Sequence, residues 1–198
     1  MRLKLLPGVV ALNVVLVSAS AFAQNLVTNG SFETGYWTGW TTGDNFQDTE
    51  VVSGYFSYYS PEDGTYYAVL GPVGSPGTLS QTFSDEPGAQ YTFSFYLAAA
   101  GDHPSAFSAM WDGNTVLSLT DPSTYNREWQ LYSFTEIGTG TDSISFSFQD
   151  DPGYMALDNI VVSSNGSGTG TIPEPSSFIL LGSGLLAVGG IAHRKSRV

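Results

Sequence analysis

The side chains best suited to holding a ligand in this sequence are aromatic rings in turn-rich stretches. Sugars are commonly bound by a flat ring against their C–H face, together with a few polar groups. Tyr36, Trp37 and the run from Tyr55 to Tyr59 all lie among Gly, Ser and Thr. We take Tyr36, Trp37 and Tyr58 as candidate ligand-binding residues, with Trp37 and Tyr58 as the preferred pair. Core packing is the alternative for each ring, because the sequence does not show which rings share a face.

Residue types that carry out catalysis are scarce in this chain. It contains no Cys, and its two His residues are His103 and His193. His103 lies in the run Gly101-Asp102-His103-Pro104, which predicts a loop. The adjacent acidic pairs stand beside Pro or Gly, which favours solvated turns over the spaced carboxylates of a glycosidase. We predict no catalytic residue, with a small glycan or ester hydrolase that uses His103 as an alternative.

One carboxylate stands in an unusual position. Asp158 interrupts the apolar run from Leu157 to Val162, and a buried carboxylate needs a partner. Arg127 is the only basic residue between the two ends of the chain. A metal ion is therefore a candidate partner for Asp158, and a set of backbone amides is the alternative.

Alternation of apolar and polar residues predicts the elements that position these side chains. In 90–97, Tyr91, Phe93, Phe95 and Leu97 point one way while Thr92 and Ser94 point the other, and 143–149 repeats the pattern. Further strands are predicted at 66–70, 78–83, 106–111, 114–119, 128–135 and 155–163, with turn signals between them. No stretch has a convincing helical period. Eight or more short strands indicate an all-β sandwich or jelly roll over 24–162.

The two ends of this sandwich resemble those of the galactose-binding-like jelly roll found in several carbohydrate-binding modules. The resemblance rests on Asn25-Leu26-Val27 and Asn29-Gly30-Ser31-Phe32-Glu33 at the start and on Leu157-Asp158-Asn159-Ile160 at the end. It implies a structural Ca2+ ion where the first and last strands meet, with Glu33 and Asp158 as ligands. Carbonyls, other side chains and water would complete about six to eight oxygen ligands. The fold hosts many functions, so it does not identify the ligand.

The first 23 residues predict a secretory signal peptide. Arg2 and Lys4 form a basic start, Leu5 to Val17 is mostly apolar, and Ala21-Phe22-Ala23 suits a signal peptidase. A buried N-terminal helix is the alternative, which the turn-rich β sequence directly afterwards disfavours. The protein is therefore predicted to be exported through the inner membrane, with residues 1–23 removed.

The chain after the sandwich divides into a linker and a membrane segment. Residues 163–172 form a linker rich in Gly, Ser and Thr. Residues 176–192 contain no charged residue, which predicts a short transmembrane helix. The basic residues after it, Arg194, Lys195 and Arg197, predict a cytoplasmic C-terminus. A plain C-terminal membrane anchor would share these features.

Residues 173–198 resemble the PEP-CTERM sorting signal of Gram-negative bacteria. The match consists of Pro173-Glu174-Pro175, the apolar helix and the terminal basic cluster, in that order. The resemblance implies processing by an exosortase-like membrane enzyme and a final place at the cell surface or outside the cell. Proteins with this signal typically accompany extracellular polysaccharide. The signal says where the protein goes and not what its domain binds.

The charge of the chain between its two ends limits the classes of molecule that the protein can bind. Arg127 is the single basic residue of this section, while all 18 acidic residues lie between Glu33 and Glu174. Such a surface repels nucleic acid and anionic membranes, so no nucleic-acid partner is expected. We predict a noncatalytic surface or extracellular-matrix protein that binds a glycan, with the cell's own exopolysaccharide as one candidate. The alternatives are a structural or adhesion protein that binds other proteins, and the hydrolase named above.

Overall fold

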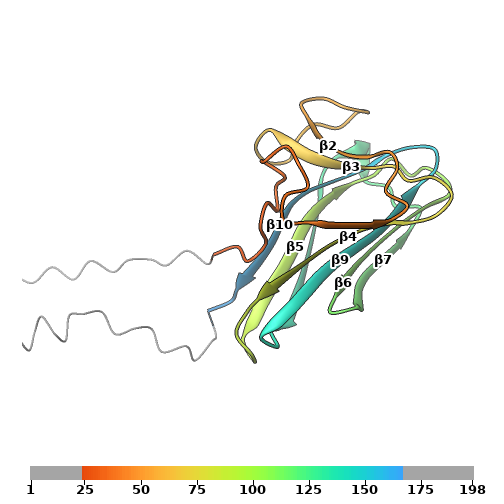
Figure 1. Cartoon of the computed structure of the whole chain (residues 1–198). Coiled ribbons are helices and arrows are strands. Elements are labelled where there is room, and N and C mark those ends of the chain that lie inside the picture. Colours follow the sequence, from red (N-terminus) through yellow and green to blue (C-terminus); the bar gives the residue numbers. More distant parts are fainter. Residues whose placement is uncertain (1–23, 167–198) are drawn as a thin grey trace, which may run out of the picture.

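The computed structural model describes residues 24–166, which form two β-sheets packed face to face (Figure 1). Sheet A has the strand order β1 (Thr41–Asp44), β4 (Gly77–Ser84), β9 (Thr141–Asp150), β6 (Ser105–Trp111) and β7 (Asn114–Thr120). Sheet B has the order β2 (Thr49–Ser53), β3 (Tyr66–Leu70), β10 (Met155–Ser164), β5 (Gln90–Ala98) and β8 (Gln130–Ile137). Neighbouring strands are antiparallel. The predicted all-β jelly-roll sandwich is confirmed.

The strands expected from alternation all form, each within two residues of its expected bounds. The sequence did not reveal β1 and β2, because these strands are mostly exposed or half-buried and show no clean alternation. Strand β8 begins two residues later than expected, after a short 3₁₀ turn at Tyr125–Arg127.

The core lies between the two sheets and consists largely of phenylalanine rings. The ring centroid of Phe146 in β9 lies 5.1 Å from that of Phe95 in β5 and 5.8 Å from that of Phe107 in β6. All three side chains are buried. Burying a ring of this size contributes about 1.5–3 kcal/mol, so contacts such as that of Phe146 with Phe95, which crosses from sheet A to sheet B, hold the two sheets together.

A second, smaller apolar cluster lies on the outer face of sheet B. Along β3, Ala68 and Leu70 point into the main core, whereas Tyr67 and Val69 point to the opposite face. The cluster joins buried residues of β3, β5 and β10 to the loop between β2 and β3, through Tyr59, Tyr67, Val69, Ala98 and Ala156. It holds residues 54–60, which we call the tyrosine loop, against the sheet.

The first and last segments of the described domain lie side by side, as the resemblance implied. The Leu26 N–H donates to the Val162 carbonyl at 2.8 Å, and the Asn25 side chain bonds the backbone of Ile160 and Val162. Both ends of the domain therefore lie on one side of the molecule (Figure 1).

Candidate functional site

Glu33 holds the start of β3 from the loop that precedes β1. Its Oε1 accepts the backbone N–H groups of Thr65 and Tyr66, both at 2.8 Å. Gly64 beside them has a φ of +65°, and a Cβ at this position would lie 2.4 Å from the Glu33 carboxyl carbon. The tight turn that presents these amides to Glu33 therefore requires Gly.

Asp158 in β10 holds the same turn from the other side. This fully buried carboxylate accepts the N–H groups of Glu62 and Asp63 on Oδ2, at 2.9 and 3.1 Å, and that of Asn159 on Oδ1 at 2.7 Å. Burial raises the pKa of Asp158 to about 7, against the lowering effect of the three amides. Glu33 and Asp158 thus meet at one segment, residues 62–66.

This geometry is compatible with an oxygen-bound cation. Asp158 uses three of the roughly four hydrogen bonds that a carboxylate can accept, and both recorded bonds to Glu33 use Oε1, which leaves Oε2 free to ligate. Within residues 24–166 no three His, Cys, Asp or Glu side chains gather as a metal-binding group. A calcium ion here would draw most of its ligands from carbonyls and water. Glu33 and Asp158 fit that role, and the ion stays a prediction.

The loop before β1 exposes Tyr36 and half-buries Trp37. The Tyr36 side chain is 76% exposed. The Trp37 ring packs edge-on against Phe32 and Phe46, with centroid distances of 5.5 and 5.1 Å. Part of the Trp37 ring therefore contributes to the core, which is the alternative that the sequence left open.

Tyr58 on the tyrosine loop presents an exposed ring with a cation over one of its faces. Its side chain is 66% exposed, and the guanidinium carbon of Arg127 lies 4.6 Å from the ring centroid. Tyr55 in the same loop is 73% exposed. Within residues 24–166 the one ion pair joins His103 to Asp121, so Arg127 forms none there. A flat ring and a set of hydrogen-bond donors thus lie together at the surface.

Hydrogen bonds fix the backbone of the tyrosine loop. The Tyr59 hydroxyl donates to the Tyr154 carbonyl at 2.8 Å, and the Tyr67 hydroxyl donates to the Tyr59 carbonyl at 3.0 Å. The indole N–H of Trp129, just before β8, donates to the Ser60 carbonyl at 3.1 Å. The loop packs on the outer face of sheet B, whereas Trp37 packs on the core between the sheets. The structure therefore does not bring the preferred pair, Trp37 and Tyr58, together.

The outer face of sheet B continues beside this loop with residues that the sequence did not mark. Tyr96 in β5 pairs with Leu131 in β8, and Ser94 pairs with Ser133. We call these four residues the β5–β8 strip. Trp129 lies at the junction of the strip and the tyrosine loop, because it precedes β8 and packs on the outer cluster. The available signal was an aromatic residue, Tyr96, on the polar face of an alternating strand.

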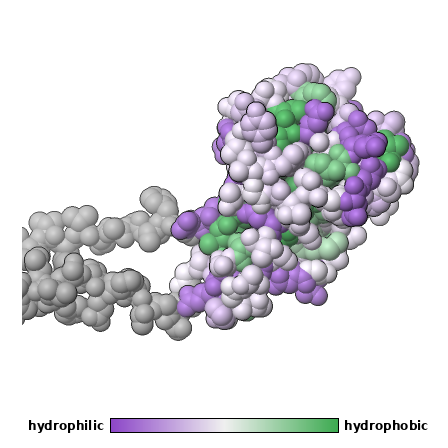
Figure 2. Space-filling view, viewed as in Figure 1, coloured by the Kyte–Doolittle hydropathy of each residue, from purple (hydrophilic) through white to green (hydrophobic). Residues whose placement is uncertain are grey.

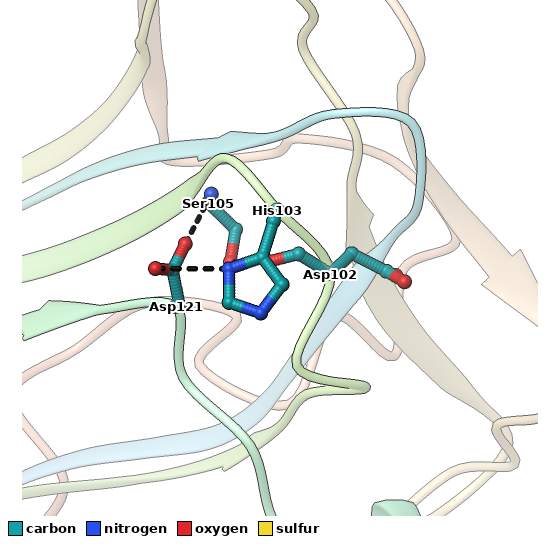
Figure 3. Close-up of polar contacts among 4 residues, drawn as sticks. All are labelled: Asp102, His103, Ser105 and Asp121. Carbon is teal, nitrogen blue, oxygen red and sulfur yellow. Dashed lines mark hydrogen bonds and ion pairs between the residues drawn. The ribbon is translucent and has the colours of Figure 1, made fainter.

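His103 forms a pair with Asp121 that has no nucleophile (Figure 3). Its Nδ1 lies 3.0 Å from Asp121 Oδ2, and Asp121 Oδ1 accepts the Ser105 N–H at 2.9 Å. Hydrogen bonds from the Ser105 amide and from His103 lower the pKa of Asp121. The Ser105 hydroxyl donates to the Asp102 carbonyl at 2.6 Å rather than to His103. Ser105 therefore does not complete a Ser-His-Asp relay.

A hollow on the outer face of sheet A is too small to accommodate a typical substrate. Its volume is about 160 Å³, whereas ligand pockets commonly measure about 300–1,000 Å³. Its lining includes Ser108, Ser118 and Ser147 and contains no acidic or His side chain. Neither this hollow nor His103 supports the hydrolase alternative.

A carboxyl pair lies between the β4–β5 turn and β9. Asp85 Oδ1 accepts the Gly140 N–H at 2.6 Å, while its buried Oδ2 has no donor within residues 24–166. Burial, followed by contact with the Asp142 carboxylate, raises the pKa of Asp85 to about 6. Asp142 is fully buried, but hydrogen bonds from Asp85 and Thr139 lower its pKa. A proton on Asp85 would give its Oδ2 a partner in Asp142.

We expect this pair to make the domain less stable as the pH rises from about 4 to 7. The folded-state pKa of Asp85 is raised, so its stabilising effect is complete below the unfolded value of about 3.9 and is lost through about pH 6. Solvent screening at this position reduces the effect to about 1 kcal/mol. In Asp85→Asn, the amide NH2 group can still donate to Asp142, but the side chain at position 85 no longer titrates.

Urea unfolding of the wild type and of Asp85→Asn, in EDTA at several pH values, measures how the free energy of unfolding of each protein changes with pH. Asp112 also faces the pair, and Asp150 and Asp158 titrate in the same direction. Their effects are common to both proteins and cancel in the comparison. Parallel pH profiles for the wild type and Asp85→Asn would contradict the shared proton.

The predicted targeting segments lie outside the described residues. These are the signal peptide (1–23), the sorting motif Pro173-Glu174-Pro175, the helix 176–192 and the basic residues Arg194, Lys195 and Arg197. Within residues 24–166, no helix has the length and apolar character needed to span a membrane.

Comparison with known families identifies the C-terminal segment. Residues 171–195 match the PEP-CTERM protein-sorting motif, which implies export, exosortase-type processing and a place at the surface or outside the cell. None of the curated proteins matches the chain significantly.

Comparison with solved structures identifies the fold. The chain is similar to TmCBM61, whose structure was solved with β-1,4-galactotriose, at a TM-score of 0.57 and 20% identity over 72% of this chain and 99% of that one. It is also similar to the K1 cleaved adhesin domain of Lys-gingipain from Porphyromonas gingivalis W83, at a TM-score of 0.51 and 19% identity over 69% of this chain and 96% of that one. The chain thus combines a jelly-roll β-sandwich, similar in fold to TmCBM61 and to the K1 adhesin domain, with a PEP-CTERM sorting motif.

Proposed function

We propose that this protein is a noncatalytic surface or extracellular protein whose jelly roll binds a neutral glycan through the tyrosine loop. The observation that carries the proposal is the exposed Tyr58 ring with the Arg127 guanidinium 4.6 Å from its centroid. A ring of this kind can stack on the C–H face of a sugar with the face that Arg127 does not cover, and a guanidinium donates hydrogen bonds to the hydroxyl groups of a sugar. The PEP-CTERM motif supports a place where glycans occur.

The β5–β8 strip is a suitable floor for further sugar units. Tyr96 and Leu131 supply apolar surface, and Ser94 and Ser133 supply hydroxyl groups. Trp129 connects this floor to the tyrosine loop through its bond to Ser60. The ligand would therefore lie across the outer face of sheet B, beside the loop.

The charge of the domain favours a neutral ligand over a polyanion. Arg127 is the only Lys or Arg among residues 24–166, which contain 17 Asp and Glu residues. Their summed field repels an anionic polymer. On the face shown in Figure 2, the hydrophobic residues lie in separate groups rather than in one continuous apolar patch.

The proposal is tested by titrating the purified full chain with soluble neutral oligosaccharides and with a polyuronate. The neutral set includes β-1,4-galactotriose, the ligand recorded with the similar TmCBM61 structure. We expect at least one neutral glycan to bind at millimolar concentration or below, and the polyuronate to bind more weakly. If no neutral glycan binds at millimolar concentration, a structural or adhesion role replaces glycan binding.

We further propose that Glu33 and Asp158 take part in binding a structural calcium ion. An ion with a dissociation constant of about 0.1–1 mM, present at 10 mM, would stabilise the fold by about 1.4–2.7 kcal/mol. Chelation should therefore lower the melting temperature by several degrees. The calcium-dependent part of that shift should shrink in Glu33→Gln, because Gln provides a weaker ligand. Identical shifts in the wild type and Glu33→Gln would show that Glu33 holds no calcium.

A further inference from the structure

Asp150, at the end of β9, is a buried carboxylate without a partner. Its side chain is 1% exposed, and its Oδ1 accepts no hydrogen bond within residues 24–166. The strand pairing places it opposite Ser105 in β6. A buried carboxylate is stable only if it is paired with a cation, hydrogen-bonded or protonated.

Asp102, in the loop between β5 and β6, also lies beside the end of β9. A Cβ on Gly153 would lie 2.0 Å from Asp102 Oδ2, so this carboxylate rests directly against the turn that follows Asp150. Figure 3 shows the Asp102 side chain pointing away from the His103–Asp121 pair. The negative charge of Asp102 is the largest effect, after burial, that raises the pKa of Asp150 to about 7.

The groups around Asp150 and Asp102 supply oxygen atoms and no positive charge. Asp151 adds a third negative charge next to Asp150. Tyr59 packs over this turn and donates its hydroxyl to the Tyr154 carbonyl at 2.8 Å. Arg127, the one Lys or Arg side chain of the described domain, lies on the Tyr58 ring and forms no ion pair there, and His103 is paired with Asp121. Nothing in residues 24–166 therefore neutralises Asp150.

We propose that Asp150 and Asp102 bind a Ca2+ ion that joins the β5–β6 loop to the turn between β9 and β10. The site is separate from that of Glu33 and Asp158, which hold residues 62–66. Its donors are oxygen atoms, which suit calcium rather than zinc. With two carboxylates, the remaining ligands are backbone carbonyls and water. Such a donor set fits the weak affinity of extracellular modules, with a dissociation constant of about 10⁻⁴–10⁻³ M.

Two variants test this site by different means. Asp150→Asn removes the charge of the buried ligand while keeping its shape. Gly153→Ala keeps every charge but places a methyl group where Asp102 Oδ2 lies. That clash involves the end of a side chain, which can move, so we expect Gly153→Ala to fold. Glu33→Gln is the matched control, because it alters the other predicted calcium site.

The measurement is a calcium titration of each purified full chain by calorimetry, with a parallel terbium titration. Terbium replaces calcium and emits when a nearby aromatic ring such as Tyr59 transfers energy to it. We expect Asp150→Asn and Gly153→Ala each to weaken binding at this site at least tenfold and to remove the part of the terbium signal that comes from this site. Glu33→Gln should leave both intact. Melting in EDTA shows that each variant is folded.

The alternative is that Asp150 holds a proton instead of an ion. In that case Asp150→Asn would be as stable as the wild type or more stable in EDTA, and calcium binding would be the same in both. That result, or the absence of any calcium binding by the wild type, overturns the proposal. Loss of binding in Glu33→Gln alone would assign the calcium to the Glu33 site and also overturn it. None of these outcomes depends on whether the domain binds a glycan.

Discussion

Replacing Asp158 with Ala is expected to lower the free energy of unfolding by about 3 kcal/mol. The change removes the acceptor of three backbone N–H groups, from Glu62, Asp63 and Asn159. Each buried donor left without a partner costs about 1–3 kcal/mol. Asp63 is exposed and water can reach it, so the lower end of this range applies. Urea unfolding in EDTA at pH 8, followed by tryptophan fluorescence, measures the loss without a contribution from bound metal.

Asp63→Ala is the matched control for this experiment. Asp63 carries an exposed carboxylate in the same turn, and the one recorded hydrogen bond of this side chain comes from the Ser31 hydroxyl at 3.3 Å. Its removal should cost less than about 0.5 kcal/mol. Asp158→Asn should fall between the two, because its carbonyl accepts some of the amides while its NH2 group faces another donor. A loss below about 1 kcal/mol in Asp158→Ala would mean that Asp158 does not hold this turn.

The sequence predicted the sandwich because alternation of apolar and polar residues shows directly which face of each strand is buried. Phe93 and Phe95 alternate with Ser94 in β5, and Phe146 and Phe148 alternate with Ser147 in β9, so one face of each strand had to enter the core. Strands β1 and β2 carry no such signal, because they lie at the edges of the sheets and bury little. Their pairing depends on neighbouring strands that are distant in sequence.

The hydrogen-bond partners of the site residues were also hard to predict, because they lie far away in the sequence. Asp158 was recognised as a buried carboxylate, but its amide donors Glu62 and Asp63 lie 96 and 95 residues earlier in the chain. Backbone groups leave no trace in the sequence, so a metal ion and amides were equally open. Turn-rich context suggested exposure for both Trp37 and Tyr58. Only the folded chain shows that Trp37 packs against Phe32 and Phe46 while Tyr58 stays exposed.

Tyr58→Ala is expected to weaken glycan binding by about five- to 150-fold without lowering the stability of the domain. By analogy with bases that stack on aromatic rings, loss of one ring costs about 1–3 kcal/mol, which corresponds to this range of affinity. The Tyr58 side chain is 66% exposed, and the cluster beneath the loop is built from Tyr59 and Tyr67. The fold therefore does not depend on this ring. Calorimetry with the best neutral oligosaccharide measures the affinity, and thermal melting measures the stability.

Two further variants locate the site, because they separate the candidate rings. Tyr36→Ala removes a somewhat more exposed ring from a different loop, so it should leave the affinity unchanged if the ligand lies on the tyrosine loop. Trp37→Ala should lower the melting temperature, since this ring packs on Phe32 and Phe46. A loss of affinity in Tyr36→Ala but not in Tyr58→Ala would move the glycan site to the loop before β1. Equal affinity in both variants and in the wild type would exclude both loops and leave the β5–β8 strip around Tyr96 as the surface to test.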